Sequence, residues 1–96
     1  MDEHPLIRFA DGPAGRRARL IGTGKDVWEV VEVVKDNGGD AAEAARYLEV
    51  SVGLVQAAVN YYGAFTDEID RMITSNQQET ERAYAAYLSG QAAVAP

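Results

Sequence analysis

Apolar residues recur at helical spacing along most of this chain and at strand spacing only near its start. The clearest helix follows Asp26, which stands at an N-cap position with Glu29 at capping-box spacing. Asn37-Gly38-Gly39 provides the stop signal at the other end. The apolar positions between these signals fall on one helical face: Val27, Val30, Val31 and Val34.

Two shorter helices joined by a tight turn are predicted between Asp40 and Tyr62. Asp40 can cap the first, with Glu43 at capping-box spacing, Glu49-Val50 makes the turn, and Ser51 caps the second. The alanines let the helices approach closely, as in a helix-turn-helix whose second helix enters a DNA major groove. A helical hairpin that serves only packing fits equally well. The positions predicted to face inward are Ala44, Ala45, Leu48, Leu54, Val55, Ala58, Val59 and Tyr62.

The first 24 residues predict a small two-stranded β-ribbon. Leu6–Phe9 and Arg17–Ile21 suit strands, the turn-rich segment Asp11–Gly15 separates them, and Gly22-Thr23-Gly24 ends the ribbon. An isolated hairpin is marginally stable in water. We therefore expect the ribbon to pack on the helices or to pair with a second chain.

A fourth helix is predicted from Thr66, which we place at its N-cap. Asp67, Glu68 and Asp70 in its first turn suit the helix dipole. Polar residues from Ser75 to Glu81 interrupt its apolar positions, which are Ile69, Met72, Ile73, Ala83, Tyr84, Tyr87 and Leu88. The later ones suit a groove on another protein. The alternative is that the tyrosines pack back on this domain or on a dimer mate.

The predicted fold is therefore mainly α, with a short N-terminal β-hairpin and a three-helix, homeodomain-like helix-turn-helix core. The predicted organisation is a ribbon plus helix-turn-helix domain over 1–63, a partner-binding helix over 64–90 and a flexible tail over 91–96. A chain of 96 residues has room for one core and an accessory segment.

Composition argues against an enzyme and against a membrane protein. The chain has no cysteine, and its single histidine, His4, lies in an N-terminal segment expected to be mobile. Asp67, Glu68 and Asp70 are ordinary first-turn residues, so we predict no metal, no cofactor and no catalysis. The sequence has neither a membrane-length apolar run nor a signal peptide, which favours a cytoplasmic location.

Charge is distributed unevenly along the chain. The net charge is -6, although nucleic-acid-binding domains usually present a basic surface. From Asp26 onward there are four cations against twelve carboxylates. A basic beginning and an acidic remainder suggest two different partners. The cations of the basic part are Arg8, Arg16, Arg17, Arg19 and Lys25.

The order of several short motifs resembles the VapB-type antitoxin family. The resemblance covers about Pro5 to Ile73, and no single motif in it is diagnostic. Family members often have an isoleucine-proline pair where this chain has Lys25-Asp26. The motifs that carry the resemblance are Gly15-Arg16, Ile21-Gly22-Thr23, Val27-Trp28, Ala57-Ala58, Tyr61-Tyr62 and Glu68-Ile69-Asp70.

The resemblance implies the antitoxin of a type II toxin–antitoxin pair. Such proteins bind and block a toxin, often a PIN-like ribonuclease, and they commonly dimerise and repress their own promoter at operator DNA. The alternative is a helix-turn-helix-shaped adaptor for protein interactions, or a small transcriptional regulator without a toxin partner. The cation-free second helix of the pair favours that alternative.

Three sets of residues are predicted to make these contacts. Gln56 and Asn60 are spaced to lie on one helix face and to read adenine edges, with Arg46 near phosphate. The DNA set is Arg16, Arg17, Arg19, Arg46, Ser51, Gln56 and Asn60. The toxin set is Ile69, Met72, Ile73, Tyr84, Tyr87 and Leu88. The dimer set is Leu6, Ile7, Phe9, Leu20 and Trp28.

Overall fold

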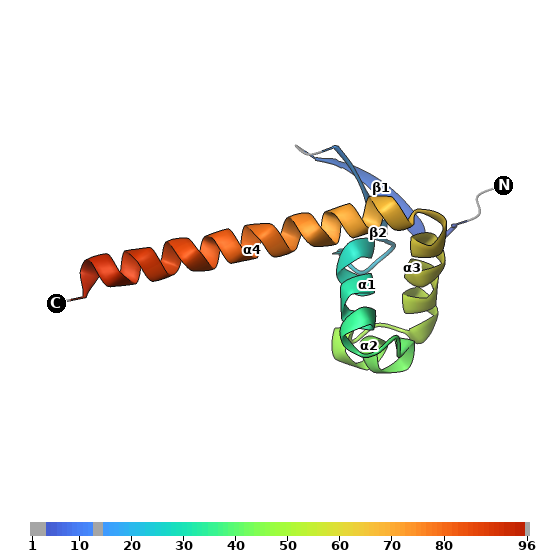
Figure 1. Cartoon of the computed structure of the whole chain (residues 1–96). Helices are drawn as coiled ribbons and strands as arrows, with labels where there is room; N and C mark the ends of the chain where they lie inside the picture. The colour runs from blue at the N-terminus through green and yellow to red at the C-terminus, as the bar shows by residue number, and fades with distance from the viewer. Residues whose placement is uncertain (1–3, 13–14, 96) are drawn as a thin grey trace.

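The computed structural model describes residues 4–12 and 15–95. Within them, a small antiparallel sheet precedes four helices (Figure 1), which confirms the prediction of a mainly helical chain with N-terminal strands. The strands are β1 (Ile7–Gly12), β2 (Gly15–Leu20) and β3 (Lys25–Asp26). The helices are α1 (Val27–Asp36), α2 (Ala41–Leu48), α3 (Val52–Ala64) and α4 (Thr66–Val94).

The sheet has three strands in the order β1-β2-β3 rather than the two that the sequence predicted. Ile7 lies opposite Leu20 and Gly12 opposite Gly15, so β1 and β2 pair over six residues each. Gly22 and Gly24 have positive φ angles, which glycine adopts without steric cost, and they turn the chain back so that β3 pairs with the end of β2. Within the predicted turn between β1 and β2, Pro13 and Ala14 lie outside the described residues.

The helix α1 forms where its signals place it. The Glu29 carboxylate accepts a hydrogen bond from the Asp26 backbone N–H at 3.2 Å, and the helix begins at Val27. Asn37 is its C-cap, and Gly38 and Gly39 follow with positive φ angles. All four valines of the predicted stripe are buried: Val27, Val30, Val31 and Val34.

The predicted pair of helices also forms. The Asp40 carboxylate accepts bonds from two backbone N–H groups at the start of α2, and the Ser51 hydroxyl accepts one at the start of α3. Glu49 makes the turn in the left-handed region, with φ 59°. Glu43 does not complete a capping box as predicted, because its carboxylate lies 3.5 Å from the guanidinium of Arg46, one helical turn later.

The core contains one large side chain that the apolar pattern missed. Tyr61 is only 1% exposed, whereas Tyr62, which the sequence placed inward, is half-buried. The Tyr61 ring stacks on Phe65 at 4.5 Å between centroids, and its hydroxyl donates to Glu68 at 3.1 Å. His4 also contacts the Tyr61 ring edge-on, so the segment expected to be mobile packs on the domain. A tyrosine is stable in the core when its hydroxyl has a partner, and here that partner comes from α4.

The start and the end of α4 differ from the prediction. Thr66 is not the cap, since its hydroxyl donates to the Tyr62 carbonyl at 2.9 Å instead of accepting from α4. Phe65 alone separates α3 from α4. The polar stretch does not interrupt the helix, and Gln91–Val94, expected as a flexible end, are helical. Most residues of this region are good helix formers.

We expect Tyr61→Ala to lower the free energy of unfolding by about 3–5 kcal/mol, because it empties a large buried volume. Tyr47 is 76% exposed on α2 and provides a matched control, for which we expect a change within about 0.5 kcal/mol. Urea unfolding followed by Trp28 fluorescence measures both variants. Equal effects of the two substitutions would contradict the central position of Tyr61.

Candidate functional site

The most prominent surface of the molecule is the second half of α4. This helix runs far beyond the remaining elements (Figure 1), and the molecule measures 61 Å along its longest axis against 30 and 23 Å along the others. Every described residue after Asn76 is exposed. The protein thus presents a helix that is free on all sides within this chain.

The first half of α4 belongs to the domain core. Ile69 and Ile73 are 0% and 7% exposed, and Met72 packs partly against the same core. All three were predicted to contact a toxin. Ile69 and Ile73 are not accessible to any partner while the domain is folded, because their face of the helix covers α1 and α3. For these two residues, the correct assignment is anchoring of α4.

The three later residues of the predicted toxin set remain exposed. Tyr84, Tyr87 and Leu88 are 62%, 59% and 47% exposed, so the tyrosines do not pack back on their own domain. Tyr87 follows Ile69 by about five helical turns, which places both on one side of α4. Together with Ala83, these side chains form the α4 stripe, which continues the core-facing side of the helix beyond the core.

A polar cluster fixes the direction in which α4 leaves the domain. Asp70 of α4 accepts a hydrogen bond from the Tyr62 hydroxyl at 2.7 Å and one from the Lys35 ammonium at 3.1 Å. These bonds, the Tyr62 bond first, hold the pKa of the Asp70 carboxyl below its usual value. The hydrogen bonds to Tyr62 and Asp70 raise the pKa of Lys35 in turn. The cluster therefore ties α1, α3 and α4 together at one point.

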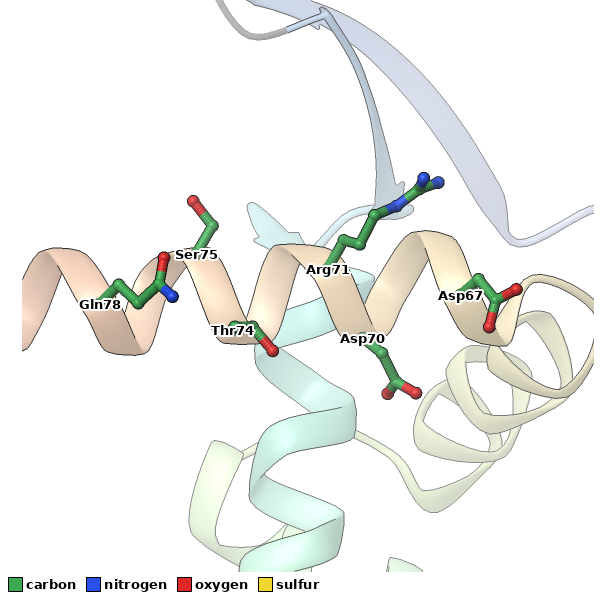
Figure 2. Close-up of a pocket in the computed structure, with 6 residues that line it drawn as sticks. All are labelled: Asp67, Asp70, Arg71, Thr74, Ser75 and Gln78. Carbon is green, nitrogen blue, oxygen red and sulfur yellow. The ribbon is translucent and has the colours of Figure 1, made fainter.

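A shallow depression of about 470 Å³ runs along one side of α4, lined by polar residues of that helix alone. Figure 2 shows Asp70, at one border of the depression, pointing toward α1 and α3, while Arg71 and Ser75 point away from these helices. Glu68 is bonded to Tyr61 as described above, so two of the three carboxylates considered as a metal cluster serve the domain. Among residues 4–12 and 15–95, no group of three potential metal ligands is assembled.

The predicted DNA-reading face of α3 is exposed. Ser51, Gln56 and Asn60 all lie on the surface. Gln56 and Asn60 share a groove of about 290 Å³ with Gly53, Ala57 and the N-terminal segment 4–6. Arg46 on α2 is also exposed, beside Glu43. The structure therefore brings Gln56 and Asn60 together, but it borders them with a chain segment that the sequence analysis did not place there.

The arginines of β2 have partners within the chain. The Nε atoms of Arg17 and Arg19 lie 3.6 and 3.1 Å from the carboxylate of Asp26, which is buried. Trp28 donates its indole N–H to the same carboxylate at 3.1 Å. Arg16 places its guanidinium 4.1 Å from the centre of the Phe9 ring. Arg17 and Arg19, predicted to contact phosphate, thus compensate a buried charge, a role that their alternation on one strand face could have indicated.

The predicted dimer set divides into buried and exposed residues. Ile7 and Leu20 are 3% and 1% exposed, so their side chains pack inside their own chain and leave little surface for a dimer contact. Trp28 is half-buried and held by Asp26. Leu6 and Phe9 remain 38% and 49% exposed. The ribbon packs one face on the helices. The sequence had suggested either this packing or pairing with a second chain.

Comparisons with protein-family models, with curated proteins and with solved structures find no match to this chain. In the described part of the chain, no helix is both long and apolar enough to cross a membrane. The α4 stripe and the exposed face of α3 are therefore the two surfaces that bear on function.

We expect Tyr62→Phe to move the pKa of Asp70 upward toward the usual value, because the strongest bond to its carboxylate is lost. NMR titration of the side-chain carboxyl measures this, with Tyr47→Phe as the control. Since the pKa of Asp70 is lowered in the folded state, its contribution to stability is present above the unfolded pKa of about 3.9. That contribution disappears as the pH falls through the folded value, and an unchanged titration in Tyr62→Phe would contradict the cluster.

Proposed function

We propose that this chain is the antitoxin of a type II toxin–antitoxin pair and that α4 binds and blocks a PIN-like ribonuclease toxin. The observation that carries this proposal is the α4 stripe, an apolar strip on the half of α4 in which every described residue is exposed. The sequence resemblance to VapB-type antitoxins supports the same assignment.

The geometry of the α4 stripe suits a helix-in-groove complex. Tyr84, Tyr87 and Leu88 stand at i, i+3 and i+4, the spacing at which an amphipathic helix anchors in a groove. Tyrosine supplies a large contact area with a polar tip and is enriched among residues that dominate binding energy. Most of the stability of a helix in a protein comes from packing of its amphipathic face, which the second half of α4 lacks in the described chain. A partner that covers the stripe therefore also stabilises the helix.

The charge of α4 suits a nuclease as partner. Glu79 and Glu81 precede the α4 stripe, and Asp67 lies exposed near the beginning of the helix. Enzymes that bind RNA usually carry basic residues at their substrate surface. An acidic helix placed there competes with the phosphate backbone, and complementary charge accelerates the association.

We further propose that a homodimer represses its own promoter, with α1, α2 and α3 as a homeodomain-like helix-turn-helix. The support is the tight left-handed turn at Glu49 together with the exposed pair Gln56 and Asn60 on α3. Exposed cations for phosphate contact are Arg46 on α2 and Arg8 on β1. Base contacts from two copies add, which offsets the weak electrostatics of one acidic chain.

One observation favours a second candidate, a protein-interaction adaptor with the shape of a helix-turn-helix. Arg17 and Arg19 are held by Asp26, and α3 contains no lysine or arginine. Both facts reduce the positive charge that is available to contact DNA phosphates. Both candidates leave α4 free for a partner protein, and they differ in operator binding and in whether that partner is a toxin.

We expect Tyr84→Ala and Tyr87→Ala each to weaken binding of the neighbouring gene's product by about 2 kcal/mol, or roughly 30-fold in Kd. Calorimetry with the purified partner measures the affinity, and co-expression tests the rescue of growth. Tyr47→Ala, another exposed tyrosine to alanine change, is the matched control and leaves Kd unchanged. A neighbour that neither binds nor is toxic would overturn the antitoxin assignment.

We expect Gln56→Ala and Asn60→Ala each to weaken binding to the chain's own promoter DNA by about 1–3 kcal/mol, because each amide is placed to pair with a base edge. Fluorescence anisotropy at fixed salt measures this loss. Gln78→Ala changes an exposed glutamine on α4 and serves as the control. If the unmodified protein shows no preference for promoter over unrelated DNA, operator binding is contradicted and the adaptor is favoured.

A further inference from the structure

The free edge of β1 is a second surface without a partner in the described chain. In the strand order β1-β2-β3, β1 pairs on one side with β2 and has no strand on the other. Figure 1 shows β1 at the periphery of the molecule, away from α1 and α2. An open six-residue edge is a template for pairing with another strand unless it is blocked.

The alternation of hydrogen-bonded and non-bonded residue pairs between β1 and β2 shows which backbone groups of β1 face its free edge. The Ile21 N–H donates to the Leu6 carbonyl at 2.9 Å, one step beyond the pairing of Ile7 with Leu20. In an antiparallel ladder, bonded and non-bonded pairs alternate, so Arg8 and Ala10 also direct their backbone groups toward β2. The N–H and C=O groups of Phe9 and Asp11 therefore point away from the sheet.

We propose that a second copy of this chain pairs with this edge, β1 against β1, around a two-fold axis that passes beside Phe9. A strand edge is self-complementary under two-fold symmetry, so the two copies form one continuous antiparallel sheet. Each Phe9 lies opposite the other and exchanges both backbone bonds with it. Each Asp11 N–H reaches the Ile7 carbonyl of the other copy.

The side chains select this register over its neighbours. Centring the axis at Arg8 or at Asp11 places like charges directly opposite each other, which is unfavourable. Centring it at Ala10 places the exposed Phe9 ring opposite the Asp11 carboxylate. Centring it at Phe9 places Ile7 there instead, whose side chain is buried in its own core. The Ile7 N–H already donates to the His4 carbonyl, so a register that relies on it as a donor loses a bond. The register centred at Phe9 needs Ile7 only as an acceptor. Its carbonyl already accepts a bond from the Arg8 guanidinium at 3.1 Å, and its second lone pair can take the Asp11 N–H of the other copy.

The surroundings of Phe9 fit an aromatic pair at the axis. Its ring is 49% exposed, contacts the Tyr61 ring at 6.2 Å between centroids and carries the Arg16 guanidinium on one side. Because facing residues of antiparallel strands share a sheet face, the two rings meet on the face that covers the helices. Pairing removes apolar surface from water and strengthens the Arg16 contacts by desolvation.

This interface is small, so the dimer depends on protein concentration. It consists of one pair of strand edges and one aromatic pair, and its buried area is smaller than that of most stable complexes. The pairing leaves the α4 stripe and the α3 face of both copies unoccupied. It can therefore fail while toxin binding through the α4 stripe holds, and the reverse.

The first test measures the mass of the full chain by sedimentation equilibrium from low micromolar to several hundred micromolar. We expect a monomer–dimer equilibrium, and a monomer throughout would overturn the proposal. Asp11→Pro removes an edge-facing N–H without touching the ladder to β2, and we expect it to weaken the dimer at least tenfold. Asp11→Asn keeps the N–H and serves as the control. A dimer unchanged in Asp11→Pro would overturn the edge pairing.

The second test reports the register and does not depend on the proline variant folding. Phe9→Lys and Phe9→Glu each place like charges opposite one another, so we expect each alone to be monomeric. Mixing the two places opposite charges at the axis, and we expect a heterodimer to form. Near-ultraviolet circular dichroism of Trp28 checks that each variant is folded. Failure of the mixture to associate would overturn the axis at Phe9.

The third measurement excludes the other exposed apolar surface as the cause of dimerisation. Tyr87→Arg introduces a charge into the α4 stripe and leaves β1 intact. We expect its monomer–dimer equilibrium to match that of the unmodified chain. Loss of the dimer in Tyr87→Arg, with retention in the Phe9 variants, would assign dimerisation to α4 and overturn the proposal.

Discussion

Burial of the valine face of α1 is the constraint on which the rest of the structure depends. The sheet, α2, α3 and α4 all pack against this one helix. Val27 and Val30 are fully buried, and β-branched side chains have few rotamers to lose there. The short sheet, marginal by itself, and the first turns of α4 each gain a hydrophobic partner from it.

A buried carboxylate at the beginning of α1 connects the sheet to this helix. Asp26 ends β3 and precedes the first turn of α1. Its carboxylate pairs with Arg17 and Arg19 and accepts a hydrogen bond from the Trp28 indole. A buried carboxylate without such partners is strongly unfavourable. Part of the basic charge at the start of the chain is therefore required by the fold, and the charge left over for a partner is smaller than the sequence suggests.

Local signals predicted the helices from Asp26 to Tyr62, because caps, apolar spacing and glycine stops act within a few residues of each other. Features that depend on distant residues were not predicted. The burial of Tyr61 requires Glu68, in the next helix, as a partner for its hydroxyl. The third strand has only two residues, too few to show a strand pattern, and it forms by pairing with β2. For the candidate site, the exposure of Tyr84 and Tyr87 followed the expectation. The burial of Ile69 and Ile73 did not, since helical spacing identifies a face but not where the domain beneath it ends.

Because Phe65 alone joins α3 to α4, a tilt of α4 on the domain moves its far end like a lever. From Ile73, the last buried residue of α4, to Tyr87 the helix is about 21 Å long at about 1.5 Å per residue. If α4 tilts by one degree about Ile73, Tyr87 moves by roughly 0.4 Å. A force on the exposed part of α4 is resisted by two hydrogen bonds near its beginning. Tyr61 and Tyr62, both residues of α3, make these bonds to Glu68 and Asp70 of α4. A load on the far end of α4 is thus carried by α1, on which it packs, and in part by α3, the helix that carries Gln56 and Asn60.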